Sequence, residues 1–364
     1  MKLRGAIIGF GNIAEKGHWP TYANSDQVEI VAVVDPSPER QQAAIHLKAN
    51  IHGYVSLEHL LDNERLDFVD ICTPPSTHVK LAQTCVQRGL HVLCEKPLSL
   101  HVGDYELLAK NLQKYDKTVF TIHNWKYAPI YQKAFEMIRK GRIGPVWHVD
   151  IFTLRDNVCK GTAQGAPSPY PLPEGEGKPE DWRKNRGIAG GGILVDHGWH
   201  AFYLLLNLMN AAPEKILAKM LLSPDDPNAL EEAVQTLVQF PEADGYIHLT
   251  WRAKMRRNNA IVQGQKGTLL LDDDRLLWTT HDGQKEEVKF DAALSAGSHH
   301  ADWFQTLLPD FLEEIHNPDK RGQNFKEAGW CVALTCAAYE SNLRGFQEVT
   351  VQFPGTVKQE PALT

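Results

Sequence analysis

The segment Cys94-Glu95-Lys96-Pro97 places an acid, a base and a proline directly after residues 89–93, an apolar run typical of a buried strand. An amine held in a partly desolvated cleft has a lowered pKa and can take the proton of a substrate hydroxyl. The alternative is a salt-bridged turn on the surface, which a Glu-Lys pair alone would favour. The elements around the segment have to decide between the two.

Strand-like and helix-like stretches alternate through the first third of the chain. The expected strands are residues 3–8, 28–34, 68–72, 91–94 and 118–122, and the expected helices include residues 38–49, 76–88 and 104–114. Strict strand-helix-strand order predicts an α/β doubly wound parallel sheet with right-handed crossovers. Ligands bind such sheets at the carboxyl ends of the strands, where Lys96 would lie.

A glycine-rich turn follows the first expected strand. Its sequence, GFGNIA at residues 9–14, fits G-x-G-x-x-A, in which glycines permit a tight turn and let the backbone approach a pyrophosphate. The second expected strand ends at Asp35, whose carboxylate would accept both ribose hydroxyls of an adenosine and repel a 2′-phosphate. These features predict NAD, with NADP disfavoured, although Arg40 in the next helix leaves NADP open.

The third expected strand ends in the loop Cys72-Thr73-Pro74-Pro75-Ser76-Thr77-His78. We expect Ser76 or Thr77 to cap the following helix and the loop to face the nicotinamide side of the cleft. For His78 taken alone, the favoured interpretation is a polar residue in a first helical turn, with a cofactor contact as the alternative.

A second candidate set lies in GGGILVDHGWH, residues 190–200. A helical register would put Asp196 and His200 on one face, where the histidine could hydrogen-bond a substrate hydroxyl or relay its proton while the aspartate orients it. Alternatively, Asp196 caps a helix and His200 packs against residues 203–206. His197 and His200 lack a third ligand at suitable spacing, so no metal is expected.

Taken in order, GFGNIA, Asp35, TPPSTH and EKP, followed by Trp182-Arg183 and GGGILVDHGWH, resemble the Gfo/Idh/MocA family of NAD(P)-dependent sugar and inositol oxidoreductases. The resemblance spans most of the chain and implies catalytic roles for Lys96, Asp196 and His200. The chain departs from the family at Tyr203, where an acid is often found, and at Lys126, where many members have arginine. Because both positions are expected to lie close to the substrate, these departures affect the expected identity of the substrate more than the expected type of reaction.

Together, the motifs and the resemblance give two sets of expected binding residues. The expected cofactor-binding residues are Gly9, Phe10, Gly11, Asn12, Ile13, Asp35, Thr73, Pro74, His78, Glu95 and Lys96. The expected substrate-binding residues are Lys96, Asn124, Lys126, Trp182, Arg183, Asp196, His197 and His200.

The second half of the chain changes character. Residues 146–153, 216–222, 233–240, 246–251 and 260–271 are expected as strands, and residues 304–315 and 329–344 as amphipathic helices. Short turns between alternating strands predict antiparallel pairing. The expected organisation is therefore an NAD-binding Rossmann-like domain at residues 1–123 and an α+β domain at residues 124–364. For the latter the resemblance implies a large open, mostly antiparallel sheet whose free face pairs subunits into a homodimer or homotetramer.

Composition narrows the partners. The 364 residues carry a formal charge of −7 without a long basic run, so neither a nucleic-acid partner nor a membrane partner is expected. The six cysteines show no CxxC spacing and are interpreted as reduced thiols of a cytoplasmic protein. The Pro- and Gly-rich residues 160–177 are expected to form an arm over the cleft or toward a neighbouring subunit, or else a passive insertion.

The function that the sequence favours is hydride transfer between NAD and a secondary hydroxyl of a polyhydroxylated substrate such as a sugar, an inositol or a derivative. Two alternatives remain. One is an NAD-dependent glycosidase of the same fold, and the other is a non-catalytic sensor or transcriptional co-regulator.

Overall fold

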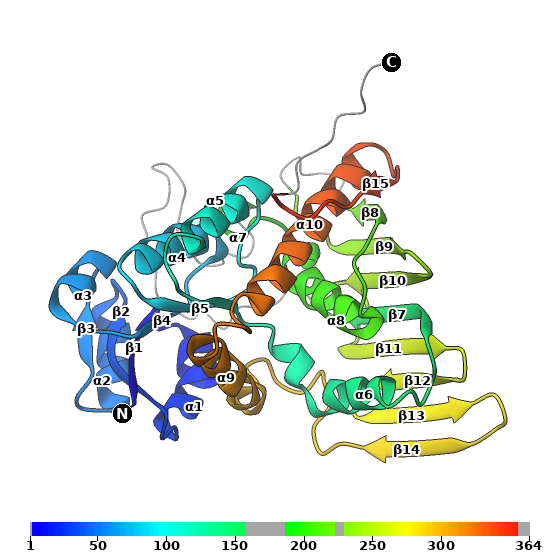
Figure 1. Cartoon of the computed structure of the whole chain (residues 1–364), viewed down its shortest axis with the longest axis horizontal. Helices are drawn as coiled ribbons and strands as arrows, with labels where there is room; N and C mark the ends of the chain where they lie inside the picture. Colours follow the sequence, from blue (N-terminus) through cyan, green and yellow to red (C-terminus); the bar gives the residue numbers. More distant parts are fainter. Residues whose placement is uncertain (1, 157–185, 223–228, 356–364) are drawn as a thin grey trace.

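The computed structural model describes residues 2–156, 186–222 and 229–355. Two separate β-sheets dominate these ranges (Figure 1). The first has six strands in the order β3-β2-β1-β4-β5-β6, and every pairing in it is parallel. Its strands are β1 (Leu3–Ile8), β2 (Val28–Val34), β3 (His52–Tyr54), β4 (Phe68–Ile71), β5 (His91–Cys94) and β6 (Val119–Thr121). The predicted doubly wound parallel sheet is confirmed.

The helical segments of this part connect successive parallel strands. They are η1 (Ala14–His18), α1 (Trp19–Ala23), α2 (Pro38–Leu47), α3 (Leu57–Asn63), η2 (Pro75–Thr77), α4 (His78–Gln87) and α5 (Val102–Leu112). Thr77 stands at the N-cap position of α4, as predicted, but its side chain makes no capping hydrogen bond. The Thr77 hydroxyl instead donates to the Pro74 oxygen at 2.8 Å, within the separate 3₁₀ turn that residues 75–77 form before the helix.

The second sheet has nine strands in the order β14-β13-β12-β11-β7-β10-β9-β8-β15. All neighbours are antiparallel except β7 and β10. The strands are β7 (Val146–Leu154), β8 (Lys215–Leu221), β9 (Ala233–Phe240), β10 (Ala243–Thr250), β11 (Arg257–Gly264), β12 (Gly267–Asp272), β13 (Arg275–Thr280), β14 (Lys285–Lys289) and β15 (Val349–Thr350). The prediction of one strand over residues 260–271 is wrong, because a turn at Gln265-Lys266 folds it into the β11–β12 hairpin.

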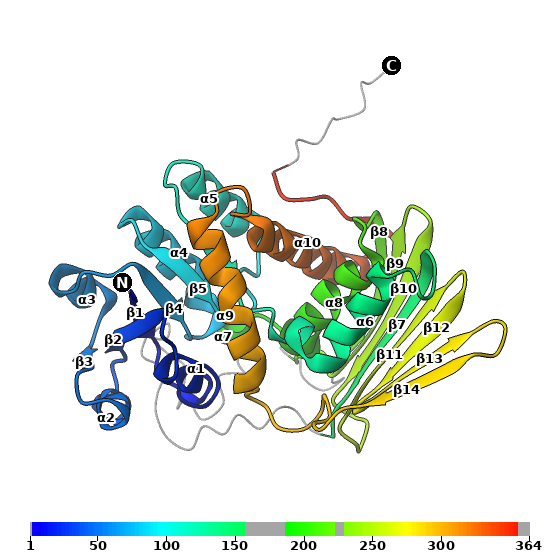
Figure 2. The same cartoon turned by 60° about the horizontal axis from the view of Figure 1, so that its bottom comes forward.

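Helices cover one face of the nine-stranded sheet. The remaining helical segments are η3 (Asn124–Tyr127), α6 (Pro129–Arg139), α7 (Arg186–Ala189), η5 (Leu194–Gly198), α8 (Trp199–Met209), α9 (Ala301–His316) and α10 (Gln323–Leu343). Figure 2 shows α6, α8 and α10 on one side of the sheet, and no described helix on the other. Alternate residues of β9 are buried accordingly, with Val234, Thr236 and Val238 facing the helices.

The last two helices return to the first domain. The Thr21 hydroxyl of α1 donates to the main-chain oxygen of Ala301 at 3.2 Å. The side chain of Asn324 in α10 accepts from the N–H of Thr121 at 2.6 Å and donates to its carbonyl at 3.0 Å. These two hydrogen bonds pair the backbone groups of Thr121 on the outer edge of β6, the edge strand of the sheet, where no further strand could pair with them. The domain boundary at residue 123 therefore stays a prediction, because α9 and α10 follow that boundary in sequence but contact both domains.

Within the described ranges, no helix combines the length and apolar character needed to span a bilayer.

We predict that Asn324→Ala lowers the free energy of unfolding by about 1–3 kcal/mol, because it leaves two buried backbone groups of Thr121 without partners. Denaturant unfolding checks this. Asn63→Ala is the matched control, because the Asn63 amide donates only to its own helix at an exposed position, and its effect should stay within about 0.5 kcal/mol. Equal losses of unfolding free energy for the two substitutions would contradict the role of Asn324 as the partner of the Thr121 backbone.

Candidate active site

The glycine turn after β1 has the shape that a dinucleotide requires. Gly9 has φ +87°, and a Cβ there would lie 2.9 Å from the Thr73 side chain, so no other residue fits this position without strain. A Cβ on Gly11 would meet nothing within 4 Å, which leaves open space beside the backbone where a pyrophosphate could approach. Asn12 and Ile13 continue the turn into η1. The residues present therefore fit NAD.

Asp35 lies at the carboxyl end of β2, beside this turn. Its Oδ2 accepts the N–H of Phe10 at 2.9 Å and its Oδ1 accepts the N–H of Ser37 at 2.9 Å. Burial raises the pKa of Asp35, while the two backbone donors oppose that shift. Each carboxylate oxygen can still accept a further hydrogen bond. Arg40, which left the choice of cofactor open, pairs with Glu15 at 3.5 Å.

The loop after β4, which contains Thr73 and Pro74, is tied to the loop after β5 by His78. Its Nδ1 lies 2.8 Å from the Pro97 carbonyl oxygen and its Nε2 lies 2.7 Å from the Thr73 carbonyl oxygen. The ring is fully buried, and burial lowers its pKa. Both ring nitrogens of His78 therefore face main-chain carbonyl oxygens of the protein, and its contact with the cofactor stays a prediction.

Lys96 follows β5 and reaches the second domain. Its Nζ donates to the main-chain oxygen of Asp196 at 2.7 Å and lies 3.5 Å from the Asp196 carboxylate. The Lys96–Pro97 peptide bond is cis. The surface-turn alternative is wrong, because only 17% of the Lys96 side chain is exposed and its partner lies in another domain.

A buried polar cluster that sequence reasoning missed supports the backbone of Lys96. Glu95 accepts the N–H of Lys96 at 3.1 Å, and its other oxygen lies 3.1 Å from Nε2 of His18. Nδ1 of His18 lies 2.8 Å from Asp70, which also accepts the hydroxyl of Tyr22 at 2.8 Å. Burial lowers the pKa of His18, but Asp70 and Cys72 together outweigh burial and hold that pKa well above its ordinary value. Burial raises the pKa of Glu95, but His18 and Lys96 together outweigh burial and hold that pKa below its usual range.

The glycine run before Asp196 is held by a buried carboxylate. Oε1 of Glu231 accepts the N–H groups of Gly192 at 2.7 Å and Leu194 at 3.2 Å, and the hydroxyl of Tyr339 at 2.8 Å. A Cβ on Gly192 would lie 2.2 Å from the main-chain oxygen of Glu231. This close approach fixes the start of η5, the π-helical turn that carries Asp196. Neither Glu231 nor Tyr339 was predicted.

The two histidines after Asp196 have different partners. Nδ1 of His197 lies 3.1 Å from the Asp196 carboxylate. Nδ1 of His200 instead lies 2.7 Å from the hydroxyl of Tyr203. The hydrogen bond that orients the His200 ring is therefore one with Tyr203, whereas Asp196 was the predicted partner. The ring of His200 stacks on Trp125, with centroids 4.6 Å apart and an angle of 15°. Burial lowers the pKa of both histidines.

The η3 turn, which carries Asn124 and Lys126, packs against α8, where the main-chain N–H of Trp125 donates to the hydroxyl of Tyr203. Nζ of Lys126 lies 3.0 Å from Glu327 of α10, which also pairs with His123. Burial raises the pKa of Glu327, but Lys126 and His123 outweigh it and hold that pKa far below its usual range. The predicted substrate residues Trp182 and Arg183, and the arm at residues 160–177, lie outside the described residues.

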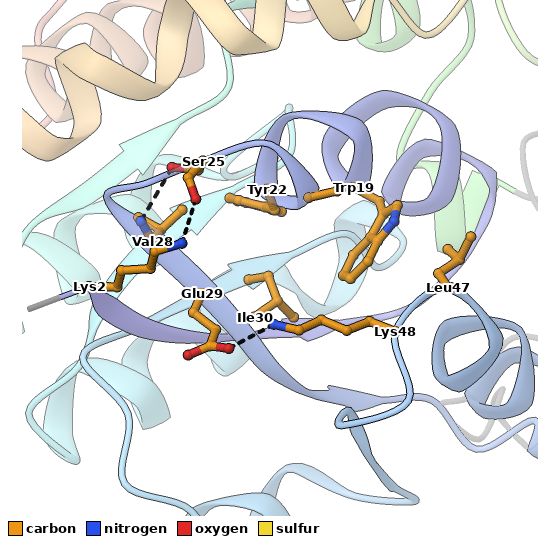
Figure 3. Close-up of a pocket in the computed structure, with 10 residues that line it drawn as sticks. Lys2, Trp19, Tyr22, Ser25, Val28, Glu29, Ile30, Leu47 and Lys48 are labelled. Carbon is orange, nitrogen blue, oxygen red and sulfur yellow. Dashed lines mark hydrogen bonds and ion pairs between the residues drawn. The ribbon is translucent and has the colours of Figure 1, made fainter.

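Two further features could be taken for separate binding sites. Donor atoms of His18, Asp70 and Cys72 lie within 4.8 Å of one another, as metal ligands can. His18 and Asp70 are hydrogen-bonded as described above, and the Cys72 thiol lies 3.2 Å from His18 and 3.5 Å from Asp70, so we interpret the three as a hydrogen-bonded cluster. Figure 3 shows a hollow beside the first residues of β2, with the Glu29–Lys48 ion pair at its wall. It lies at the amino end of that strand, opposite the carboxyl ends where Asp35 and Lys96 lie.

The fold and these motifs agree with comparisons to known proteins. Residues 3–123 match the oxidoreductase family with an NAD-binding Rossmann fold, and residues 131–270 match the GFO/IDH/MocA C-terminal domain. The chain therefore belongs to the GFO/IDH/MocA family of NAD-dependent oxidoreductases, as the motifs indicated.

Individual relatives are sugar and inositol enzymes. The chain is 27% identical over 278 residues to the myo-inositol 2-dehydrogenase of Thermotoga maritima, covering 75% of this chain and 76% of that protein. It is 26% identical over 207 residues to the D-glucoside 3-dehydrogenase of Escherichia coli, covering 56% of this chain and 54% of that protein.

Solved structures show the same fold at lower identity. Levoglucosan dehydrogenase in complex with NADH and L-sorbose superposes with a TM-score of 0.81 at 18% identity, covering 98% of this chain and 100% of that one. The aldose-aldose oxidoreductase of Caulobacter crescentus complexed with glycerol gives a TM-score of 0.77 at 22% identity, covering 96% and 100%.

We predict that Gly192→Ala destabilises the protein by about 1–3 kcal/mol, because the added methyl group has to displace the backbone of Glu231. Catalytic efficiency should fall with it, since η5 would shift. Gly103→Ala in α5 is the control, because its Cβ would meet nothing within 4 Å, and it should be neutral or slightly stabilising. Thermal unfolding of both variants checks the prediction, and a Gly192 variant as stable as the parent would refute it.

Proposed function

We propose that the chain is an NAD-dependent dehydrogenase that oxidises a secondary hydroxyl of a polyhydroxylated substrate, namely a sugar, an inositol or a derivative. The observation that carries this proposal is the contact between Nζ of Lys96 and Asp196, with His200 one helical turn further on. It lies at the carboxyl ends of the parallel strands, the edge where a dinucleotide would bind.

In this proposal each residue has a distinct part. NAD, when bound, supplies the acceptor for the hydride that leaves the substrate carbon. Lys96 takes the hydroxyl proton, and the resulting ammonium is stabilised by the Asp196 carboxylate 3.5 Å away. Because the Asp196 main-chain oxygen also accepts from Nζ, the amine has a fixed direction. The ring of His200, which stacks on Trp125, is close enough to Lys96 for the charge of the lysine to lower the histidine's pKa.

The arrangement around Asp35 supports NAD over NADP. The carboxylate that would face the adenosine ribose is already held in place by two backbone N–H groups. A 2′-phosphate there would meet a buried negative charge, and the nearby Arg40 is paired with Glu15.

Charge balance around Lys126 supports a neutral substrate. The Lys126 amine is compensated by Glu327, so an acidic substrate would gain little from this lysine. Hydroxyl groups, which can both donate and accept, suit a site of paired charges and imidazoles.

The bare face of the nine-stranded sheet supports a homodimer or homotetramer. Leu237, which alternates along β9 with the helix-facing Thr236 and Val238, is 45% exposed there, and covering an exposed large apolar side chain favours association. A reducing cytoplasmic location fits the five free cysteines of the described residues.

We predict that NAD(H) binds at least about tenfold more tightly than NADP(H), equivalent to about 1.4 kcal/mol. Titration of both dinucleotides by calorimetry measures this ratio. Asp35→Ser should narrow the ratio, because it removes the repelled charge. Equal or reversed affinity in the parent would remove the basis for NAD specificity.

We predict that Lys96→Ala lowers turnover by at least about a hundredfold while NAD affinity is unchanged, because the base is lost but the glycine turn is intact. The exposed Lys80 of α4 gives the control variant Lys80→Ala, which should match the parent. The assay follows NADH on a panel of sugars and inositols. Accumulating NADH indicates a dehydrogenase, recycled NADH with bond cleavage indicates a glycosidase, and ligand binding without either indicates a sensor.

A further inference from the structure

The hydroxyl of Tyr203 connects two groups of the candidate active site. Nδ1 of His200 lies 2.7 Å from the hydroxyl oxygen, and the main-chain N–H of Trp125 donates to the same oxygen at 3.0 Å. Tyr203 is fully buried, and His200 and Trp125 are 6% and 9% exposed. Water therefore has little access to these atoms, so their protons have to be shared among the groups present.

Only one distribution of protons satisfies every group. The N–H of Trp125 can only donate, so the tyrosine oxygen accepts there and has one proton of its own to give. Burial raises the pKa of Tyr203 well above its ordinary value, so that proton is retained. Among the described residues, Nδ1 of His200 is the acceptor that the hydroxyl contacts. Were Nδ1 protonated instead, two donors would face each other and one proton would be buried without an acceptor.

The rings around the hydroxyl leave it little freedom to turn elsewhere. The Tyr203 ring stacks on His123, with centroids 4.4 Å apart. His123 is itself fixed, because its Nε2 accepts from the indole N–H of Trp199 at 3.0 Å and its Nδ1 faces Glu327. On the other side, His200 stacks on Trp125.

The charges around His200 favour its neutral form. Burial lowers its pKa well below the ordinary value, and Lys96, His197 and His123 act in the same direction. The opposing charge is the carboxylate of Asp196. A neutral imidazole with Nδ1 accepting has its single proton on Nε2.

We propose that Tyr203 is a positioning residue that fixes His200 as the Nε2–H tautomer, which makes His200 a hydrogen-bond donor to a substrate oxygen and not a proton acceptor. The role toward substrate rests on the proposed dehydrogenase function, whereas the tautomer does not. The oxygen that gives its proton to Lys96 gains negative charge, and a donor at Nε2 stabilises that charge. Of the two roles that the sequence left open for His200, hydrogen bonding is therefore assigned and proton relay is not.

A carboxylate at position 203 would have the opposite effect. It would accept from Nδ1–H, leave a lone pair on Nε2 and raise the pKa of His200. Tyr203→Glu therefore tests the same assignment in the reverse direction.

The tautomer is measured by nitrogen NMR on the full chain labelled with ¹⁵N-histidine, without cofactor or substrate. The His200 signal is assigned as the one missing from His200→Gln. At neutral pH we expect a protonated Nε2 and an unprotonated Nδ1. A protonated Nδ1, alone or in an imidazolium, would overturn the proposal. Because no turnover is needed, this result stands even if the proposed function fails.

Two substitutions then test the contribution of the hydroxyl. Tyr203→Phe should mix the tautomers and lower kcat by at least about tenfold with NAD affinity unchanged. Tyr131→Phe, a buried tyrosine of α6 whose ring packs against Phe135, should leave both unchanged. Tyr203→Glu should add an ionisation to the pH profile of kcat/KM that the parent lacks. If Tyr203→Phe keeps the parent's tautomer and kcat, Tyr203 does not position His200.

Discussion

The contact between Lys96 and Asp196 is the interaction on which the rest of the site depends, because it joins a strand end of one domain to a helical turn of the other. Once Lys96 has taken a proton, an ammonium and a carboxylate stand partly out of water, and the cost of that desolvation is recovered only if both groups are held in good geometry. Much of the surrounding structure supplies that geometry. The site is therefore a property of the domain interface and not of either domain alone.

Each partner of this contact is fixed by a buried carboxylate behind it. On the Rossmann side, Glu95 accepts the backbone N–H of Lys96 and is held in turn by His18. On the other side, Glu231 accepts two backbone N–H groups at the start of the turn that carries Asp196. Both carboxylates act on the backbone, so they set where the reactive side chains begin. Tyr203 acts later, on the ring of His200.

The parallel sheet and the reactive residues could be predicted because their signals are local. Apolar runs, glycine spacing and the motifs around Lys96 and Asp196 are continuous in sequence. β3 was not predicted because it is only three residues long and not fully buried. The turn between β11 and β12 was not predicted because the alternation of apolar and polar residues continues through Gln265-Lys266. His18 and Glu231 could not be predicted, since their partners lie far along the chain and a lone histidine or glutamate carries no local signal. Residues 203–206 were named as possible packing partners of His200, but a spacing of three residues in a helix does not reveal that Tyr203 contributes a hydrogen bond as well as ring contacts.

We propose that hydride leaves a substrate carbon for the nicotinamide while Lys96 takes the hydroxyl proton. This is tested with sugars and inositols deuterated at their C–H positions, incubated with NAD and the intact chain, with the label located by NMR. We expect deuterium at C4 of accumulated NADH together with one equivalent of ketone, and at least about a hundredfold slower formation of both with Lys96→Ala. Substrate that binds the parent chain with NAD but never transfers its label would contradict this proposal.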